Sequence, residues 1–208
     1  MQKKWVLLVA VTATIIALDQ WTKYLVLRDL TYAFEGASDF GARLKIFTHD
    51  APQAGLYEQH YRSKPPYVIS QDFFRFRYAE NPGAAFGLFR NLPEGLRGPL
   101  FHLVSIGAVF LILHYFRKLQ GTKQEAWAIG GLPLVLGGAI GNYIDRLSRG
   151  FVIDFIDAHW KEDPSLAWPA FNIADSAIVV GVIMLFIDSY VRKEVKDTKK
   201  AAIPEPAK

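Results

Sequence analysis

Four long apolar stretches divide this chain, separated by polar linkers and loops. The stretches run over about residues 5–27, 98–116, 126–144 and 169–191. A helix rises about 1.5 Å per residue, so the first stretch would be about 34 Å long, enough to cross a hydrocarbon core about 30 Å thick. The pattern therefore predicts an all-α membrane protein, in which four transmembrane helices form a bundle.

The third stretch contains many glycines. They lie at Gly130, Gly131, Gly137, Gly138 and Gly141. Glycine weakens a helix in water, but in a membrane small residues let neighbouring helices approach closely. We therefore expect this helix to pack tightly against others.

The first stretch follows two lysines, Lys3 and Lys4, so a signal peptide has to be considered. The apolar part of a signal peptide is typically about 7–15 residues long and ends at a small-x-small cleavage site. This stretch is longer and has no convincing site of that kind. We predict a retained membrane span.

The distribution of Lys and Arg predicts the orientation. Basic residues precede the first stretch, lie in the short link between the second and third, and follow the fourth, and such regions are typically cytoplasmic. Both termini are then cytoplasmic, and the loops over about residues 28–97 and 145–168 lie on the outer side. Residues 1–191 would form one membrane-embedded domain, and residues 192–208 a basic cytoplasmic tail.

The first outer loop contains the alternating segment "FFRFRY". Phe74, Phe76 and Tyr78 would share one face and Arg75 and Arg77 the other, which is the periodicity of a strand. This strand is either an ordinary surface strand or one that lies at the membrane interface with its aromatic rings toward lipid. The segment of about residues 32–69 has many Gly, Pro, Tyr and charged residues, and its pattern predicts no element.

The composition excludes several kinds of chemistry. The chain has 208 residues, a net charge of +4 and no cysteine. Disulfides, cysteine nucleophiles and cysteine-bound zinc are therefore impossible within this chain. There is no GxSxG motif either.

Polar residues gather near the outer ends of the predicted helices. Asp19 and Lys23 are four residues apart and can pair on one helix face, which would neutralise both. Asn142, Asp145 and Arg146 lie on one face at the end of the third stretch, where they can tie the outer loop down. By themselves these groups require only a structural role.

Asp154 and Asp175 are the candidate catalytic residues. Asp154 has apolar neighbours in "VIDFID", and Asp175 begins the fourth helix at the same outer boundary. Two carboxylates that meet in a poorly solvated site share a proton, which is the arrangement of aspartic proteases. One activates a water molecule and the other polarises the peptide carbonyl.

Other interpretations of the same carboxylates stay open from the residues alone. Membrane carboxylates also serve transporters and proton relays, and polar residues can merely hold helices together. Asp154, Asp157 and His159 could suggest a metal site, but the five histidines are scattered and no HExxH spacing occurs. We expect neither a metal nor a cofactor.

Five motifs in order resemble those of one family, the prolipoprotein signal peptidases (signal peptidase II) of the bacterial inner membrane. They are "DQWTK" at residues 19–23, "NPGAAFG" at 81–87, "GGAIGNYIDR" at 137–146, "VIDFID" at 152–157 and "FNIADSAI" at 171–178. Each motif is weak alone, but their order and their placement relative to four spans are specific.

The resemblance implies an activity. Members of this family are aspartyl endopeptidases that remove the signal peptide from diacylglyceryl-modified prolipoproteins, cutting before the lipidated cysteine at the outer face of the cytoplasmic membrane. The family's catalytic pair falls on Asp154 and Asp175. Its supporting and substrate-binding residues fall on Asp19, Lys23, Asn81, Asn142, Asp145, Arg146 and Asn172.

The resemblance also implies a small extramembrane β-cradle on the outer face, which agrees with the strand predicted at "FFRFRY". The insert of about residues 32–69 is longer than expected for the family. The partners would be lipidated prolipoproteins and membrane lipid, not nucleic acid, and we expect a monomer because four spans can pack around one site. The GxGD signature of another class of intramembrane aspartyl protease is absent.

The transporter and scaffold alternatives fit less well. A transporter would favour acidic residues along a path through the bilayer, whereas these gather at one boundary. A scaffold gives no reason for a second aspartate beside Asp154.

Overall fold

The computed structural model describes residues 2–49, 59–83, 93–161 and 168–201. Four long helices are apolar enough to cross a membrane, which confirms the predicted fold class. They are α1 (Gln2–Leu30), α3 (Glu94–Lys118), α4 (Ala126–Arg149) and α5 (Ile173–Ala201). Each has an end that runs beyond its apolar stretch, because polar residues can continue a helix at the membrane surface.

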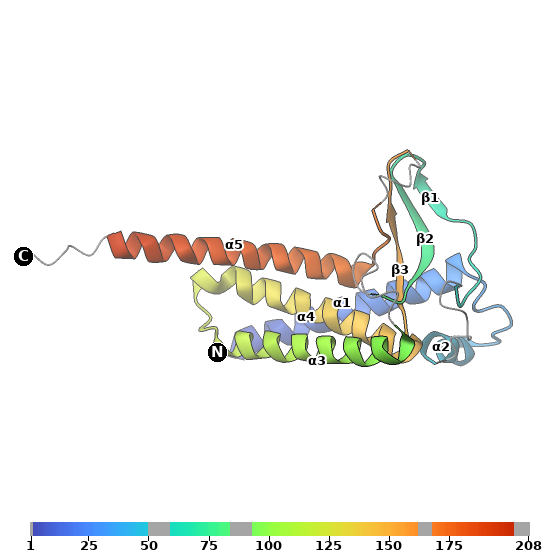
Figure 1. Ribbon diagram of the computed structural model, residues 1–208, viewed down its shortest axis with the longest axis horizontal. Helices are drawn as coiled ribbons and strands as arrows, with labels where there is room; N and C mark the ends of the chain where they lie inside the picture. The colour runs from blue at the N-terminus through green and yellow to red at the C-terminus, as the bar shows by residue number, and fades with distance from the viewer. Residues whose placement is uncertain (1, 50–58, 84–92, 162–167, 202–208) are drawn as a thin grey trace, which may run out of the picture.

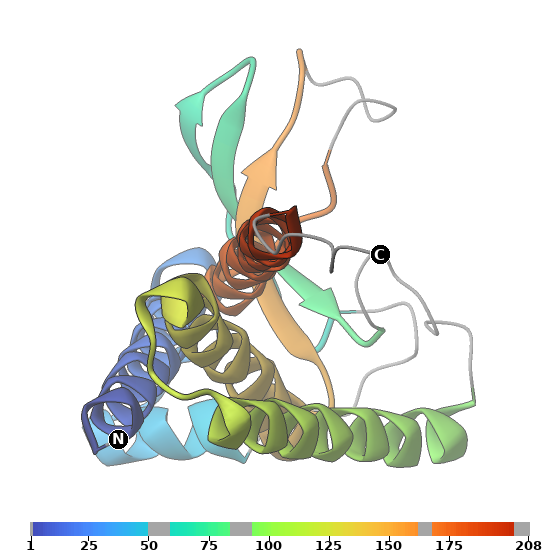
Figure 2. The ribbon, with the colours of Figure 1, turned by 90° about the vertical axis from the view of Figure 1, so that its left-hand side faces the viewer.

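The central helix of the bundle is α4, which packs against α1, α3 and α5 (Figures 1 and 2). The glycines of α4 explain the close approach to α5. A Cβ atom at Gly138 would lie 2.3 Å from the backbone oxygen of Ala174 on α5. Only a residue without a side chain allows this contact, so the expectation of tight packing is met.

The start of α1, the end of α3 and the last turns of α5 lie at one end of the bundle. The ammonium group of Lys4 donates to the backbone oxygens of Phe116, 3.1 Å away, and of Leu119. The 3₁₀ turn η2 (Lys123–Glu125) leads into α4 at the same end, and Arg192 of α5 lies 3.7 Å from Glu125.

A three-stranded antiparallel sheet rises at the opposite end (Figure 1). Its order is β1 (Tyr67–Ser70), β2 (Phe74–Asn81) and β3 (Val152–Ala158). In the β2–β3 ladder Arg75 pairs with Asp157, and the ladder is irregular between Phe76 and Ala79. This sheet confirms the strand predicted at "FFRFRY" and the small sheet added to the bundle.

The insert contains a helix that the sequence pattern did not predict, α2 (Phe40–Thr48). The side chain of Asp39 caps it by accepting a hydrogen bond from the Ala42 amide at 2.8 Å. Phe47 is buried in a core that joins α1 to the sheet and contains Tyr24, Tyr61 and Ile153. The described part of the insert is therefore packed against the domain.

Some sequence predictions concern residues outside the described ranges. These are residues 50–58 of the insert, residues 84–87 of the "NPGAAFG" motif and the last residues, 202–208, of the basic tail.

Candidate active site

Asp154 lies on β3 with its side chain facing the end of the bundle. It is only 3% exposed. Its carboxylate accepts hydrogen bonds from the side-chain amides of Asn81, at 3.1 Å, and Asn172, at 2.7 Å. Burial raises the pKa of Asp154 to about 7, and the nearby charge of Asp175 adds to this.

Asp175 lies in the first turn of α5 and forms a reciprocal cap with Asn172, the residue before the helix. The side-chain oxygen of Asn172 accepts from the Asp175 amide at 2.9 Å, and the Asp175 carboxylate accepts from the Asn172 amide at 3.2 Å. This is the geometry of a capping box, with Asn and Asp in place of the usual residues. It explains why α5 begins at Ile173, four residues after the start of the apolar stretch.

Two asparagines connect the carboxylates. The side chain of Asn172 is fully buried and donates to both Asp154 and the side-chain oxygen of Asn142, which is 3.1 Å away. The side-chain nitrogen of Asn142 in turn donates a hydrogen bond to the Asp175 carboxylate at 2.7 Å. The structure therefore brings Asp154 and Asp175 into one hydrogen-bonded group, supplied by β3, α4 and α5.

Lys23 occupies the centre of a second polar group just beneath. Its fully buried ammonium contacts Asp19 at 2.7 Å, Asp145 at 2.8 Å and the Asn142 side-chain oxygen at 3.2 Å. Asp19 also accepts from the amide of Ala174, in the first turn of α5. The predicted Asp19–Lys23 pair is thus present, and it joins α1 to α4 and α5.

Asp145 is held by more groups than the sequence indicated. Besides Lys23 it accepts from the Ile153 amide at 3.1 Å, from Gln20 at 2.8 Å and from Arg149, one turn further along α4. Buried charges need such partners, and Lys23 and Arg149 balance the two carboxylates Asp19 and Asp145. Sequence reasoning missed Gln20 and Arg149, although the four-residue spacing of Asp145 and Arg149 could have suggested a pair.

Arg146 is half-buried and faces the aspartate pair. It donates to the backbone oxygens of Asn142, at 3.2 Å, and Gly83, at 3.0 Å, and its guanidinium lies 4.7 Å from the ring centre of Phe101. Its Nε atom has no hydrogen-bond partner within the described part of the chain. Arg146 therefore has a donor left over beside the two carboxylates.

Asp157 and His159 do not join this site. Asp157 is three residues after Asp154 on a strand, and its carboxylate accepts from Arg75 at 2.8 Å and Arg77 at 2.6 Å. Burial would raise the pKa of Asp157, but these two guanidinium groups hold it below its usual value. Within the described ranges, Asp154, Asp157 and His159 do not form a group that could hold a metal ion, and Arg75 and Arg77 bind Asp157 instead.

Comparison with known proteins agrees with this fold. The sequence model of the family described as signal peptidase (SPase) II matches residues 11–191. The chain belongs to the signal peptidase II family.

Relatives and a solved structure show how far the likeness extends. A lipoprotein signal peptidase of Anaeromyxobacter sp. (strain Fw109-5) is 48% identical over 188 residues, covering 88% of this chain and 84% of that protein. One from Pseudomonas paraeruginosa (strain DSM 24068 / PA7) is 36% identical over 149 residues, covering 72% and 85%. A solved bacterial membrane enzyme shares the fold, with a TM-score of 0.60 at 22% identity over 97% of this chain and 94% of that one.

Membership of the signal peptidase II family makes this chain a peptidase and a multi-pass membrane protein.

Proposed function

We propose that this chain is an aspartyl endopeptidase whose catalytic residues are Asp154 and Asp175. The observation that carries this proposal is their joint hydrogen bonding through Asn142 and Asn172 at the sheet end of a membrane bundle. Their surroundings differ in the way an acid–base pair requires. Asp154 is buried with a pKa of about 7, whereas Asp175 is partly exposed.

The two carboxylates would divide the chemistry. Protonated Asp154 hydrogen-bonds the oxygen of the scissile carbonyl, and ionised Asp175 takes a proton from the attacking water. Water oxygen then bonds to the carbonyl carbon to form a tetrahedral intermediate. When this intermediate collapses and the C–N bond breaks, Asp175 passes the proton that it took from water to the leaving amine and is ionised again.

The remaining polar residues hold this geometry or bind substrate. Asn142 and Asn172 orient the two carboxylates, and Asn81 donates to Asp154 from β2. Asp19, Lys23 and Asp145 fix the ends of α1, α4 and α5 beneath the pair. The unpaired donor of Arg146 is suited to a backbone carbonyl of the substrate.

The substrates that we propose are diacylglyceryl-modified prolipoproteins, cut before the lipidated cysteine. The name lipoprotein signal peptidase that the similar proteins carry supports removal of signal peptides from lipoproteins. The diacylglyceryl group and the cut before the lipidated cysteine are what the resemblance of the five motifs implies. The protein would act as a monomer in the bacterial cytoplasmic membrane, with both termini in the cytoplasm and the site at the outer leaflet.

A transporter or proton relay is less well supported by the same residues. No Asp, Glu, Lys or Arg occurs in residues 5–18 of α1, 126–144 of α4 or 176–187 of α5. The middle of these helices therefore offers no acidic path between the two ends of the bundle.

The decisive experiment is cleavage of a purified diacylated precursor peptide by the Asp154→Asn and Asp175→Asn variants. Each should reduce kcat by about three orders of magnitude or more, while the variant inserts and melts like the wild type. An unmodified precursor, assayed in parallel, tests dependence on the lipid. Near-normal cleavage by either folded variant would overturn the assignment of the pair.

A further inference from the structure

The insert between α1 and β1 contacts two residues, Arg149 and Glu80, which lie next to the candidate site. Successive side chains of a strand point to opposite faces, so a strand can hold the site on one face and the insert on the other. On β2, Asn81 donates to Asp154, and the preceding Glu80 binds the insert. On β3, Asp154 alternates with Ile153, which is buried in the core shared with the insert.

The first contact point is Arg149. This side chain is 6% exposed, and its guanidinium donates to the backbone oxygen of Phe47, in the last turn of α2, while it lies 4.5 Å from the centre of the Phe47 ring. The other guanidinium nitrogen binds Asp145, whose second carboxylate oxygen accepts from the Ile153 amide. One arginine thus links the insert helix to the residue before Asp154.

The second contact point is Glu80. Its carboxylate accepts from the His60 backbone amide at 2.8 Å and contacts the His60 ring nitrogen at 2.6 Å, while the His60 ring stacks on Phe151 at 4.5 Å. The backbone amide of Tyr61 also donates to Glu80. In the β2–β3 ladder Glu80 lies opposite Ile153. Both contact points therefore converge on the residue next to Asp154.

We propose that the insert is a brace for the active site, in which Arg149 and Glu80 act as positioning residues for Asp154. The insert packs on the face of β2 and β3 that is opposite Asp154, and this packing limits movement of Asp154 relative to Asp175. This role rests on the proposed function of the pair. Neither residue touches the substrate, so removing the brace should reduce kcat more than it changes KM.

The test compares three variants in the cleavage assay. Arg149→Met keeps the length of the side chain but removes its charge and donors. His60→Phe keeps the ring on Phe151 and the backbone hydrogen bond to Glu80 but loses the contact between the ring nitrogen and Glu80. Each should lower kcat about 10-fold or more, because a small misplacement of a catalytic group is costly, with KM changed less than about twofold. Arg149→Lys, which keeps a charge for Asp145, should recover part of the loss.

The matched control is Arg62→Met. Arg62 is an exposed insert residue whose guanidinium lies 4.1 Å from the ring centre of Tyr32. This variant should cleave like the wild type. A folded Arg149→Met variant with unchanged kcat, or with a change in KM alone, would overturn the brace.

A second measurement does not depend on catalysis. Amide hydrogen exchange at Ile153 should be faster in Arg149→Met than in the wild type, while exchange in the middle of α5 stays unchanged. If the wild type cleaves no lipidated peptide, the proposed function fails, yet this measurement still decides whether the insert restrains β3. Equal exchange at Ile153 in both proteins would contradict the brace.

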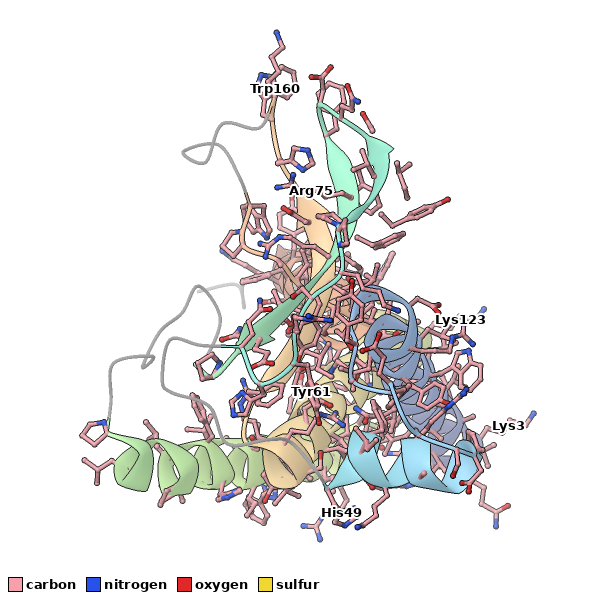
Figure 3. All side chains as sticks on the ribbon, turned by 90° about the vertical axis from the view of Figure 1, so that its right-hand side faces the viewer. Lys3, His49, Tyr61, Arg75, Lys123 and Trp160 are labelled. Atoms are coloured by element: carbon pink, nitrogen blue, oxygen red, sulfur yellow. The ribbon has the colours of Figure 1, made fainter. Side chains whose placement is uncertain are left out.

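The exposed face of α2 carries an independent inference. Phe40 and Leu44 are one turn apart and are 63% and 43% exposed. The Phe40 ring lies 6.1 Å from that of Tyr24, which stacks on Trp21, a 56% exposed residue of membrane helix α1. The exposed apolar surface of α1 thus continues onto α2. This helix lies across the end of the bundle, above the labelled His49 and below Tyr61 (Figure 3).

The geometry points to direct contact between α2 and the membrane interface, with Phe40 and Leu44 among the lipid chains. A helix that lies in the plane of the membrane and buries an apolar face is typical of interfacial anchors. Because the chain has no cysteine, one engineered cysteine can carry a fluorescent bimane label.

The test places this label at Leu44→Cys or, as a control, at the exposed Glu35→Cys, in vesicles that contain brominated lipids. Bromine should quench the label at residue 44 strongly and the label at residue 35 weakly. Equal or absent quenching at the two positions would overturn membrane contact and would leave α2 facing water or another protein.

Discussion

At the scale of residues, the candidate site depends on asparagines as much as on aspartates. Asn172 starts α5, donates to Asp154 and contacts Asn142, all from one buried side chain. A neutral amide can bridge two carboxylates without neutralising either, whereas a lysine at this place would hold both ionised. The charged partner Lys23 is instead bound to Asp19 and Asp145. This separation leaves the aspartate pair free to share a proton.

The pKa of Asp154 leads to a prediction about pH. Catalysis requires protonated Asp154, whose pKa burial raises to about 7, so kcat/KM should fall as pH rises through about 7. Asn81→Leu removes a donor that favours the ionised form, and its alkaline limb should move to higher pH. The measurement is cleavage of the diacylated peptide from pH 5 to 9, with recovery after return to pH 6 as the control for unfolding. An alkaline limb at the same pH in both proteins would contradict the role of Asp154.

At the scale of elements, the position of Asp175 depends on how closely α5 approaches α4. Gly138 and Gly141 bring the first turn of α5 against α4, and a Cβ atom at Gly141 would lie 2.8 Å from the carboxylate of Asp19. Asp19 in turn binds the amide of Ala174. The start of α5 is therefore held by its own cap, by a close helix contact and by a carboxylate from α1.

Gly138→Ala should disturb this contact. The added methyl group meets the backbone oxygen of Ala174, which cannot move without shifting α5, so we expect a loss of about 1–3 kcal/mol of stability and a lower kcat. Gly107→Ala on α3 is the matched control, since a Cβ atom there meets nothing within 4 Å. Thermal unfolding in detergent and the cleavage rate measure both effects. A fully stable and active Gly138→Ala variant would show that the helices can separate without consequence.

At the scale of the whole molecule, the two ends of the bundle differ in character. One end carries the start of α1, the end of α5 and the link between α3 and α4, and the other carries the sheet and α2 (Figure 1). The aspartate pair lies at the sheet end, on β3 and in the first turn of α5. Aromatic side chains such as Trp160 lie at the tip of the sheet, away from the helices (Figure 3). All of the proposed chemistry is thus at one surface of the membrane.

This polarity gives a prediction about orientation. A membrane-impermeant maleimide should label Gln71→Cys, in the turn between β1 and β2, in intact spheroplasts, and should label Lys3→Cys only after permeabilisation. The basic residues near the termini favour that orientation. The cysteine-free parent protein is the control for background. The reverse labelling pattern would place the site on the cytoplasmic side.

The sequence by itself determined the four spans and the strand at "FFRFRY", because hydropathy and strand alternation are local properties of the chain. Its motifs also indicated the aspartates and asparagines of the candidate site, but not Gln20 and Arg149. It did not predict helix α2, because the segment of about residues 32–69 around this helix is rich in Gly, Pro and charged residues, as a loop is. The helix is held in place by the burial of Phe47. Only the tertiary structure decided which partner each charge has. Arg149 joins Asp145 to the insert, and Arg75 and Arg77 take Asp157, because these contacts depend on how β3 pairs with β2 and packs on α4.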